Sequence, residues 1–234
     1  MSLKKNLHEL SQKIEDLSPK EGLAFLSDLF YGKLVFSTSL GQEDQVITHI
    51  IAENTLPVKI FSLDTGRLFP ETLELLARTE KRYKTKIKVY YPERQSVEKL
   101  VDNIGINGFY ESVENRKSCC QVRKVEPLQR ALSRNSVWIT GLRAAQSPNR
   151  LAMKKIEWDE ANQIIKYNPL LDWSFEQMIN YINENNIPYN PLHDKGFISI
   201  GCAPCTRAIQ AGEDPRAGRW WWEESKKECG LHAK

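Results

Sequence analysis

Four of the five cysteines in the chain fall into two close pairs. Cys119 and Cys120 are adjacent, and Cys202 and Cys205 form a C-x-x-C motif in a turn that contains Gly and Pro. The two pairs supply four thiolates, which suits either a zinc ion or a [4Fe–4S] cluster. The spacing does not decide between the two metals. Buried free cysteines that bind no metal are the alternative interpretation.

The remaining cysteine, Cys229, lies close to the C-terminal end. The thiolate is the nucleophilic form of cysteine; two neighbouring lysines and His232 favour it, whereas Glu228 opposes it. Such a thiol could attack a bound substrate and then be reached by another protein. An ordinary exposed cysteine is the alternative interpretation, and composition alone favours it.

Two loops of small and polar residues follow predicted strands. The first runs from Ser37 to Asp44, includes Ser39 and Gly41, and enters a predicted helix. Backbone N–H groups at a helix N-terminus favour phosphate. The loop is neither a Walker loop nor a G-x-G-x-x-G fingerprint, which disfavours a dehydrogenase. The second loop is Asp64-Thr65-Gly66-Arg67. Ordinary turns are the alternative for each loop, but two at one sheet edge indicate a nucleotide site.

Three groups of basic residues could bind a phosphate or sulfate group. They are Arg123 with Lys124, Arg143 with Arg150, and Arg216 with Arg219. Guanidinium groups recognise such anions through paired hydrogen bonds. Solvated surface charge is the alternative for each group. The Trp triplet at 220–222 is expected to pack against an irregular segment rather than to stack on a base.

The pattern of apolar residues predicts the elements that position these groups. Strands are expected at 34–37, 58–63, 87–90 and 137–140, and helices at 42–54, 70–84, 96–103, 122–133 and 174–185. Helices are also expected before residue 31, one of them starting at Ser18-Pro19, and a hairpin is expected from 153–156 and 163–167.

Strands separated by helices predict an α/β fold with a parallel sheet and helices on both faces. Ligands of such sheets bind beyond the carboxyl ends of the strands, where the two polar loops lie. A single domain over 1–234 is expected, with a helical prelude (1–31), a core (32–210) and an irregular, mobile tail (211–234) that carries Cys229.

Composition excludes several classes of protein. The chain has 234 residues, 41% of them hydrophobic and 27% charged, which is typical of globular proteins. The net charge of +3 is too small and dispersed for a nucleic-acid-binding face. No apolar run reaches the ~20 residues of a membrane-spanning helix, and the N-terminus does not resemble a signal peptide. An odd number of cysteines favours a reducing compartment, so a cytoplasmic protein is expected. A homo-oligomer is compatible with this sequence.

Taken together, the motifs resemble those of the assimilatory adenylyl-sulfate (APS) reductases, relatives of the 3′-phospho-APS (PAPS) reductases. The resemblance extends from the Ser37 loop to His232. It is carried by these segments: Cys119-Cys120 with Arg123-Lys124, Gly201 to Arg207, Gly212 to Glu223, and Glu228-Cys229-Gly230-Leu231-His232.

The resemblance implies a fold of the adenine-nucleotide alpha-hydrolase type, related to the PP-loop enzymes. It implies that Cys119, Cys120, Cys202 and Cys205 bind a [4Fe–4S] cluster and that Cys229 is the nucleophile. It places four residues near the phosphosulfate: Lys124, Arg216, Arg219 and His232. It places six in loops at the adenosine-binding edge: Ser37, Ser39, Gly41, Asp44, Asp64 and Gly66.

One stretch departs from the family pattern. After the strand at 137–140, the family has Gly-x-Arg-Arg, an acidic residue, Gln-Ser and Thr-Arg. Ala144, Ala145 and Asn149 replace three polar side chains there, between Arg143 and Arg150.

The function implied by the resemblance is thioredoxin-dependent reduction of APS to sulfite and AMP, with an S-sulfocysteine at Cys229, in sulfate assimilation and cysteine biosynthesis. A PAPS or dual-specificity reductase is the closest alternative. A zinc-bound, nucleotide-binding redox regulator is the alternative from another class. Iron with acid-labile sulfide would indicate the reductase, and stoichiometric zinc the regulator.

Overall fold

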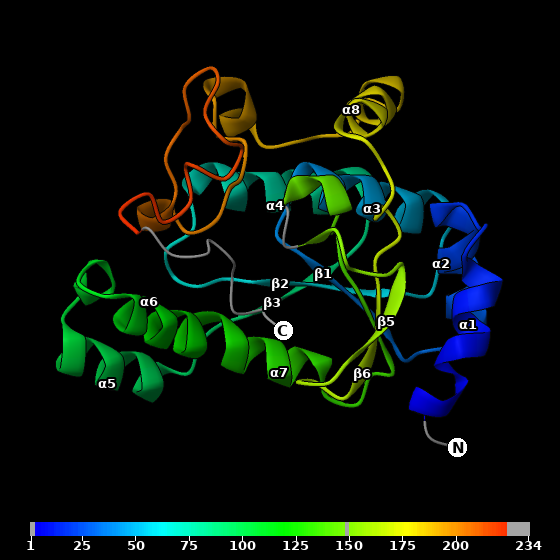
Figure 1. Cartoon of the computed structure of the whole chain (residues 1–234), viewed down its shortest axis with the longest axis horizontal. Helices are drawn as coiled ribbons and strands as arrows, with labels where there is room; N and C mark the ends of the chain where they lie inside the picture. The colour runs from blue at the N-terminus through cyan, green and yellow to red at the C-terminus, as the bar shows by residue number, and fades with distance from the viewer. Residues whose placement is uncertain (1–2, 148–149, 224–234) are drawn as a thin grey trace. The chain divides into compact units, whose positions relative to one another are not determined.

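The computed structural model describes residues 3–147 and 150–223 (Figure 1). Contacts group the chain into two compact units. The first comprises Met1–Ser62, Glu74–Lys88 and Leu132–Asn190, and the second comprises Leu63–Leu73, Val89–Ala131 and Pro191–Lys234. The expected single domain with a mobile tail stays a prediction.

A six-stranded sheet has the order β3-β2-β1-β4-β6-β5. The strands are β1 (Leu34–Thr38), β2 (Lys59–Leu63), β3 (Ile87–Tyr90), β4 (Val137–Ile139), β5 (Ile156–Asp159) and β6 (Ile164–Tyr167). β1 runs parallel to both β2 and β4, and β4 runs parallel to β6, whereas β5 is antiparallel to β6. Because the chain returns from one side of β1 to the other, the β1–β4 boundary is a switch point of the topology.

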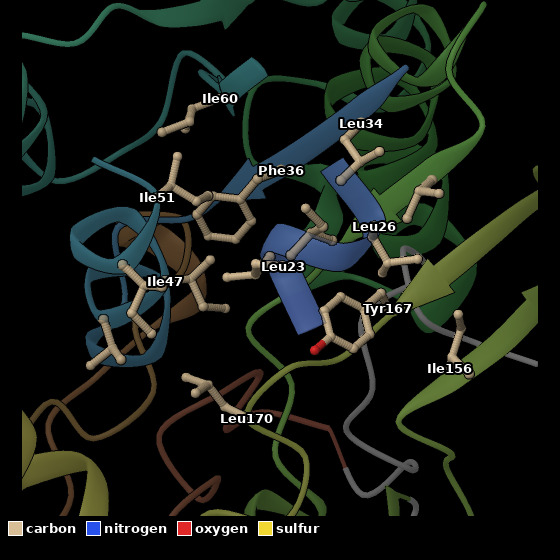
Figure 2. Close-up of a cluster of buried hydrophobic side chains, with 14 of the residues drawn as sticks. Leu23, Leu26, Leu34, Phe36, Ile47, Ile51, Ile60, Ile156, Tyr167 and Leu170 are labelled. Carbon is tan, nitrogen blue, oxygen red and sulfur yellow. The ribbon is translucent and has the colours of Figure 1, made fainter. Parts of the chain in front are cut away.

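The core of the first unit joins this sheet to the N-terminal helices. Figure 2 shows Phe36 of β1 among aliphatic side chains of neighbouring elements, with Leu23, Leu26 and Ile47 near it. Phe36, Leu23 and Leu26 are fully buried. Burial of each such side chain stabilises the fold by roughly 1.5–3 kcal/mol.

Two helices of the first unit begin at a serine that caps the first turn, Ser18 and Ser174. After a short 3₁₀ turn, η1 (Leu3–Asn6), come α1 (Leu7–Ile14) and α2 (Pro19–Leu29). Ser18 Oγ accepts a hydrogen bond from the Glu21 backbone N, and the Glu21 carboxylate accepts one from the Ser18 backbone N. This reciprocal cap confirms the predicted helix start. The others are α3 (Gln42–Glu53), which contacts β1, α8 (Phe175–Glu184), and most of α4 (Pro70–Tyr83).

The second unit has one long helical stretch and little other regular structure. It contains α5 (Arg94–Ile104), η2 (Gly108–Tyr110), α6 (Val113–Cys120), the π-helical turn η3 (Gln121–Val125) and most of α7 (Glu126–Leu132). After Asn190 its described residues form only short 3₁₀ turns, among them η6 (Pro191–Lys195) and η7 (Ala203–Cys205), and an isolated bridge.

These elements agree with the predicted α/β class, with three differences. The edge hairpin makes the sheet mixed rather than purely parallel, and β5 lies later than expected, at Ile156–Asp159. The helix expected at 122–133 is the last part of a helical stretch that begins at Val113 and includes both tandem cysteines. None of the helices within the two described ranges is long and apolar enough to cross a membrane.

Candidate functional site

In the first unit, the loop after β1 is organised by the buried carboxylate of Asp44. Its Oδ2 accepts hydrogen bonds from the Ser39 backbone N (2.5 Å) and from Ser39 Oγ (2.7 Å). Leu40 adopts a left-handed conformation with φ of 62°, stabilised by a bond from its N to Thr38 Oγ1 (3.0 Å). Burial raises the pKa of the Asp44 carboxyl to about 7, although the Ser39 hydrogen bonds oppose that shift.

The turn after β4 lies against this loop. A Cβ atom on Gly141 would overlap Oδ1 of Asp44, so only glycine fits there. The buried Arg143 guanidinium pairs through Nε with Glu43 Oε1 at 2.9 Å. Arg150, also buried, hydrogen-bonds Gln146, whose Oε1 also accepts from the Arg143 backbone N (3.1 Å).

The N-terminus of α3 fits the predicted phosphate site. Its N-cap, Gly41, supplies no side-chain hydrogen bond to the first turn of the helix. Helix N-termini carry a partial positive charge and N–H groups that can bind an anion. The Ser37 hydroxyl faces the sheet, where it accepts from Trp138 Nε1 (2.8 Å).

In the second unit, the loop after β2 has hydrogen bonds within itself and also contacts a cysteine and an arginine from distant segments. Asp64 Oδ1 accepts from the Gly66 N (2.8 Å), and Gly66 has a φ of 71° that suits glycine. The Thr65 hydroxyl lies 3.2 Å from Cys202 Sγ, and the Thr65 carbonyl accepts from Arg123 Nη1 (2.7 Å).

All four paired cysteines line one pocket of the second unit. Thiols enter it from the end of α6 and from the turn η7. Its lining is Arg67, Phe109, Arg116, Cys119, Cys120, Arg123, Lys124, Cys202, Pro204, Cys205 and Trp220. The four cysteines form no disulfide. A pocket that combines thiols with several cations can stabilise negative charge on sulfur.

The electrostatics of the pocket differ from one thiol to the next. Burial by itself raises the pKa of Cys202, but the charge of Lys124 and hydrogen bonds from Thr65 and Lys124 outweigh burial and hold that pKa below its ordinary value. Burial, reinforced by the charge on Cys202, raises the pKa of Cys205 to about 12. Cys202 is therefore ionised more readily than Cys205.

Arg219 and Arg216, the two predicted anion-binding arginines near the C-terminal end, differ in burial and in their contacts. Arg219 is buried, with its guanidinium 4.7 Å from the centre of the Trp220 ring and packed against Gly201, next to Cys202. Arg216 is half-buried, and its backbone N donates to Asp214 Oδ1 (2.8 Å). Cys229 and His232 lie outside the described residues.

The comparisons with known proteins agree on a family. Residues 33–208 match the model of the phosphoadenosine phosphosulfate reductase domain, which is most of the chain. The adenosine 5′-phosphosulfate reductase of Allochromatium vinosum is 55% identical over 200 residues, covering 85% of this chain and 78% of that protein. The chain belongs to the PAPS reductase family. The expected family is thereby confirmed, together with the expected enzyme class, an oxidoreductase acting on a sulfur group.

Solved structures agree with this. The PAPS reductase of Candida auris, in a phosphate complex, matches with a TM-score of 0.73 and 32% identity over 88% of this chain and 97% of that one. The FMN adenylyltransferase of Candida glabrata matches with a TM-score of 0.54 and 18% identity over 94% of this chain and 70% of that one, which shows the fold alone. The expected adenine-nucleotide alpha-hydrolase fold is confirmed.

The pocket of this PAPS reductase family member suits an iron–sulfur cluster by its donor set. Among the described residues, no group of three or more His, Cys, Asp or Glu side chains is placed to hold a metal ion. A four-iron cluster takes one thiolate at each iron, so its ligands need not converge on a point. Thr65 and Lys124 hydrogen-bond a thiol, and such bonds are typical around cluster ligands.

The structure sorts the predicted residues into two groups. Ser37, Ser39, Gly41, Asp44, Arg143 and Arg150 lie in the first unit; Asp64, Gly66, Lys124, Arg216, Arg219 and the four paired cysteines lie in the second. The loop at Asp64 contacts the pocket, which the sequence did not suggest. Sequence reasoning named Thr65 and Glu223 only as members of longer segments, with no role for either side chain, and it missed Arg116. A signal for Arg116 was available, since it precedes the tandem cysteines by one helical turn.

Proposed function

We propose that this enzyme reduces APS to sulfite and AMP in assimilatory sulfate reduction, with thioredoxin as the electron donor. The observation that carries the proposal is the pocket in which four thiols and Lys124 come together, in a chain 55% identical to a protein named adenosine 5′-phosphosulfate reductase. Free thiols in that number suit a reducing cytoplasm.

The first step is displacement at sulfur. The Cys229 thiolate attacks the sulfonyl sulfur of APS, the bond from that sulfur to the phosphate oxygen breaks, and AMP leaves with the electron pair. Cys229 then carries the sulfonate as S-sulfocysteine. Negative charge grows on the departing phosphate, so cations that contact it stabilise the transition state more than the ground state. Lys124, Arg216, Arg219 and His232 are assigned to this role.

The second step returns the thiol. A thioredoxin thiolate attacks Sγ of Cys229, the sulfur–sulfur bond breaks, and sulfite leaves with the electron pair. The second thioredoxin thiol then resolves the mixed disulfide. Thioredoxin is oxidised by two electrons, and the substrate sulfur is reduced from the level of sulfate to that of sulfite.

Nucleotide binding is assigned to the loops at the strand ends. The uncapped N-terminus of α3 at Gly41 supports a phosphate or ribose contact in the first unit. Ser39 and Asp44 are assigned to shaping that loop, because each satisfies the other. Ser37, Asp64 and Gly66 complete the proposed adenosine edge. Arg143 and Arg150 are proposed as weaker contributors, since Glu43 and Gln146 already bind them.

Cys119, Cys120, Cys202 and Cys205 would hold a [4Fe–4S] cluster. When bound, such a cluster would supply a fixed local charge, since thioredoxin provides the electrons. Lys124, which interacts with Cys202, would be oriented by that environment toward substrate.

The test is the intact mass of anaerobically purified protein after incubation with APS, or with PAPS, and no reductant. We expect one added sulfonate that maps to Cys229 with APS, and sulfite release once thioredoxin is added. Cys229→Ser should keep its iron and lose both signals. An adduct with PAPS instead would change the assigned substrate, and normal sulfite release by Cys229→Ser would refute the nucleophile.

A further inference from the structure

One buried ion pair in the second unit joins two segments that are distant in sequence. Arg116 Nε lies 2.6 Å from Glu223 Oε1, and Arg116 Nη2 lies 3.1 Å from Glu223 Oε2, so the pair is bidentate. The two side chains are only 4% and 3% exposed. Glu223 is the last residue that the structure describes before Cys229, which follows six positions later in the sequence.

The partner of Glu223 belongs to the cysteine pocket. Arg116 lies on α6, three and four residues before the tandem cysteines, and it lines the pocket with them. Its guanidinium interacts with Cys120 and lies 4.7 Å from the centre of the Trp220 ring. One guanidinium therefore contacts both a pocket thiol and the residue from which the Cys229 segment departs.

Burial of two charges is an expensive way to gain stability. The desolvation of a buried ion pair offsets most of its attraction, and apolar residues of similar size often stabilise a fold as well. What a bidentate pair supplies is geometry, because the planar guanidinium accepts the carboxylate in one orientation. The pair thus fixes the position of Glu223 relative to α6.

The length of the chain beyond Glu223 limits where Cys229 can go. Six residues reach at most ~20 Å when fully extended. Without the ion pair, Glu223 keeps a backbone bond from its N to Trp220 O (2.9 Å), and Trp222 keeps its ring contacts with Phe109 and Tyr110. If these also gave way, the tether would start at Trp220, whose N donates to Cys205 O (3.3 Å), nine residues before Cys229. That longer tether alone would lower the local concentration of the thiol only about twofold. Loss of a defined starting direction costs more, roughly tenfold or greater.

We infer that Arg116 and Glu223 are positioning residues, which hold the base of the Cys229 segment on the cysteine pocket so that the thiol meets the bound substrate. The inference rests on the proposed function, because it assigns Cys229 as the nucleophile. Neither residue is assigned a contact with the reacting atoms.

The experiment compares Glu223→Gln with a matched control, Glu213→Gln. Glu213 forms another bidentate pair in the second unit, with Arg207 (2.8 and 2.9 Å), but that pair is partly exposed. The readouts are the single-turnover rate at which APS sulfonates Cys229 in the iron-loaded enzyme, the affinity for AMP, and the iron content.

Glu223→Gln is expected to slow sulfonation roughly tenfold or more, with AMP affinity and iron content as in the wild type. Glu213→Gln is expected to match the wild type in all three. A slowing of twofold or less in Glu223→Gln that retains its iron would overturn the inference, because lengthening the tether explains that much.

A second variant covers the case in which Glu223→Gln loses its iron. Arg116→Lys keeps the charge beside Cys120 but cannot form the paired bonds, and it should slow sulfonation in the same way. In iron-loaded protein, the double variant should be no slower than the slower single variant, whereas additive losses would overturn the pairing. If the wild type itself forms no adduct, the proposed function fails; if it forms one and the variants match its rate, only the inference fails.

Discussion

The loops after β1 and β2 have similar compositions, but they are stabilised in different ways. In the first, Asp44 holds Ser39, and Arg143 from the turn after β4 holds Glu43, so the polar groups satisfy one another within the loop and the adjacent strand end. In the second, Thr65 contacts Cys202 and Arg123, which lie far away in the sequence.

This difference indicates how far the order of each loop depends on a bound group. The first loop reaches its geometry with protein hydrogen bonds alone, so the nucleotide site proposed there would be preformed. The second loop also has internal hydrogen bonds, but it is tied to a thiol that lines a pocket, so we expect its order to depend on what that pocket binds. Four predictions test that contrast.

The largest effect is expected for Cys202→Ser. Loss of one thiolate should remove nearly all bound iron, and amide hydrogen exchange should rise in Asp64–Arg67 while Ser37–Asp44 stays protected. Iron analysis and exchange mass spectrometry measure the two effects, with Cys229→Ser as the control that retains iron. Full iron content in Cys202→Ser would remove Cys202 from the ligand set.

The second prediction concerns pH and the first loop. The Asp44 pKa is about 7 in the fold against an ordinary value of 3.8, so the folded state holds this proton more tightly than the unfolded state. The free energy of unfolding should therefore fall as pH rises from about 4 to about 7, by on the order of a few kcal/mol. Urea unfolding at several pH values measures it. A slope that persists unchanged in Asp44→Asn would assign it to other groups.

The third prediction separates the two regions with two glycine substitutions. In Gly141→Ala the new methyl group overlaps the Asp44 carboxylate, and overpacking of this kind costs about 1–3 kcal/mol. AMP affinity should fall roughly tenfold, with iron content unchanged. Gly201→Ala, whose methyl group would meet Arg219 next to Cys202, should instead reduce iron content more than it reduces AMP affinity. Calorimetric titration measures the AMP affinity, and iron analysis measures the iron content. If both substitutions changed both quantities equally, the two loops would not differ in the way described.

The smallest effect is expected for Thr65→Val. The substitution removes the hydroxyl that lies 3.2 Å from Cys202 Sγ and keeps the shape of the side chain. A hydrogen bond of this kind contributes about 1 kcal/mol, so iron should be released to a chelator roughly fivefold faster. Absorbance of the released iron complex measures the rate. Release at the wild-type rate would mean that this hydroxyl does not stabilise the bound group.

The parts predicted best from the sequence were those with a strong local pattern. The strand at Ile87–Tyr90 and the helix at Phe175–Glu184 were predicted nearly to the residue, because β-branched runs and a spaced apolar face specify them locally. Helix α6 was missed. Val113–Cys120 is mostly polar and has no apolar face, so its helical state depends on the Ser112 cap and on tertiary contacts.

In the candidate site, too, the residues with a local sequence pattern could be predicted and those paired over long distances could not. The four cysteines and Lys124 could be named from motif spacing. The ion pair between Arg116 and Glu223 spans 107 positions, and no local pattern encodes a partner at that distance. Arg143 and Arg150 were predicted as anion-binding groups, but Glu43 and Gln146 bind them. The pair of Arg143 with Glu43 spans 100 positions and depends on how strands meet across the sheet, whereas Gln146 lies only four residues before Arg150.

The π-helical turn after the tandem cysteines has a consequence for insertions and deletions. A π turn spaces its hydrogen bonds five residues apart instead of four, so it accommodates one extra residue in the helix. Removing one residue from Gln121–Val125 would therefore let the helix continue as a regular α-helix with Glu126–Leu132 kept on the same side, whereas the same deletion in a regular α-helix would rotate everything beyond it by about 100°. Homologues that share these motifs but differ by one residue here should keep the same side of α7 buried and should differ in whether this turn is π-helical.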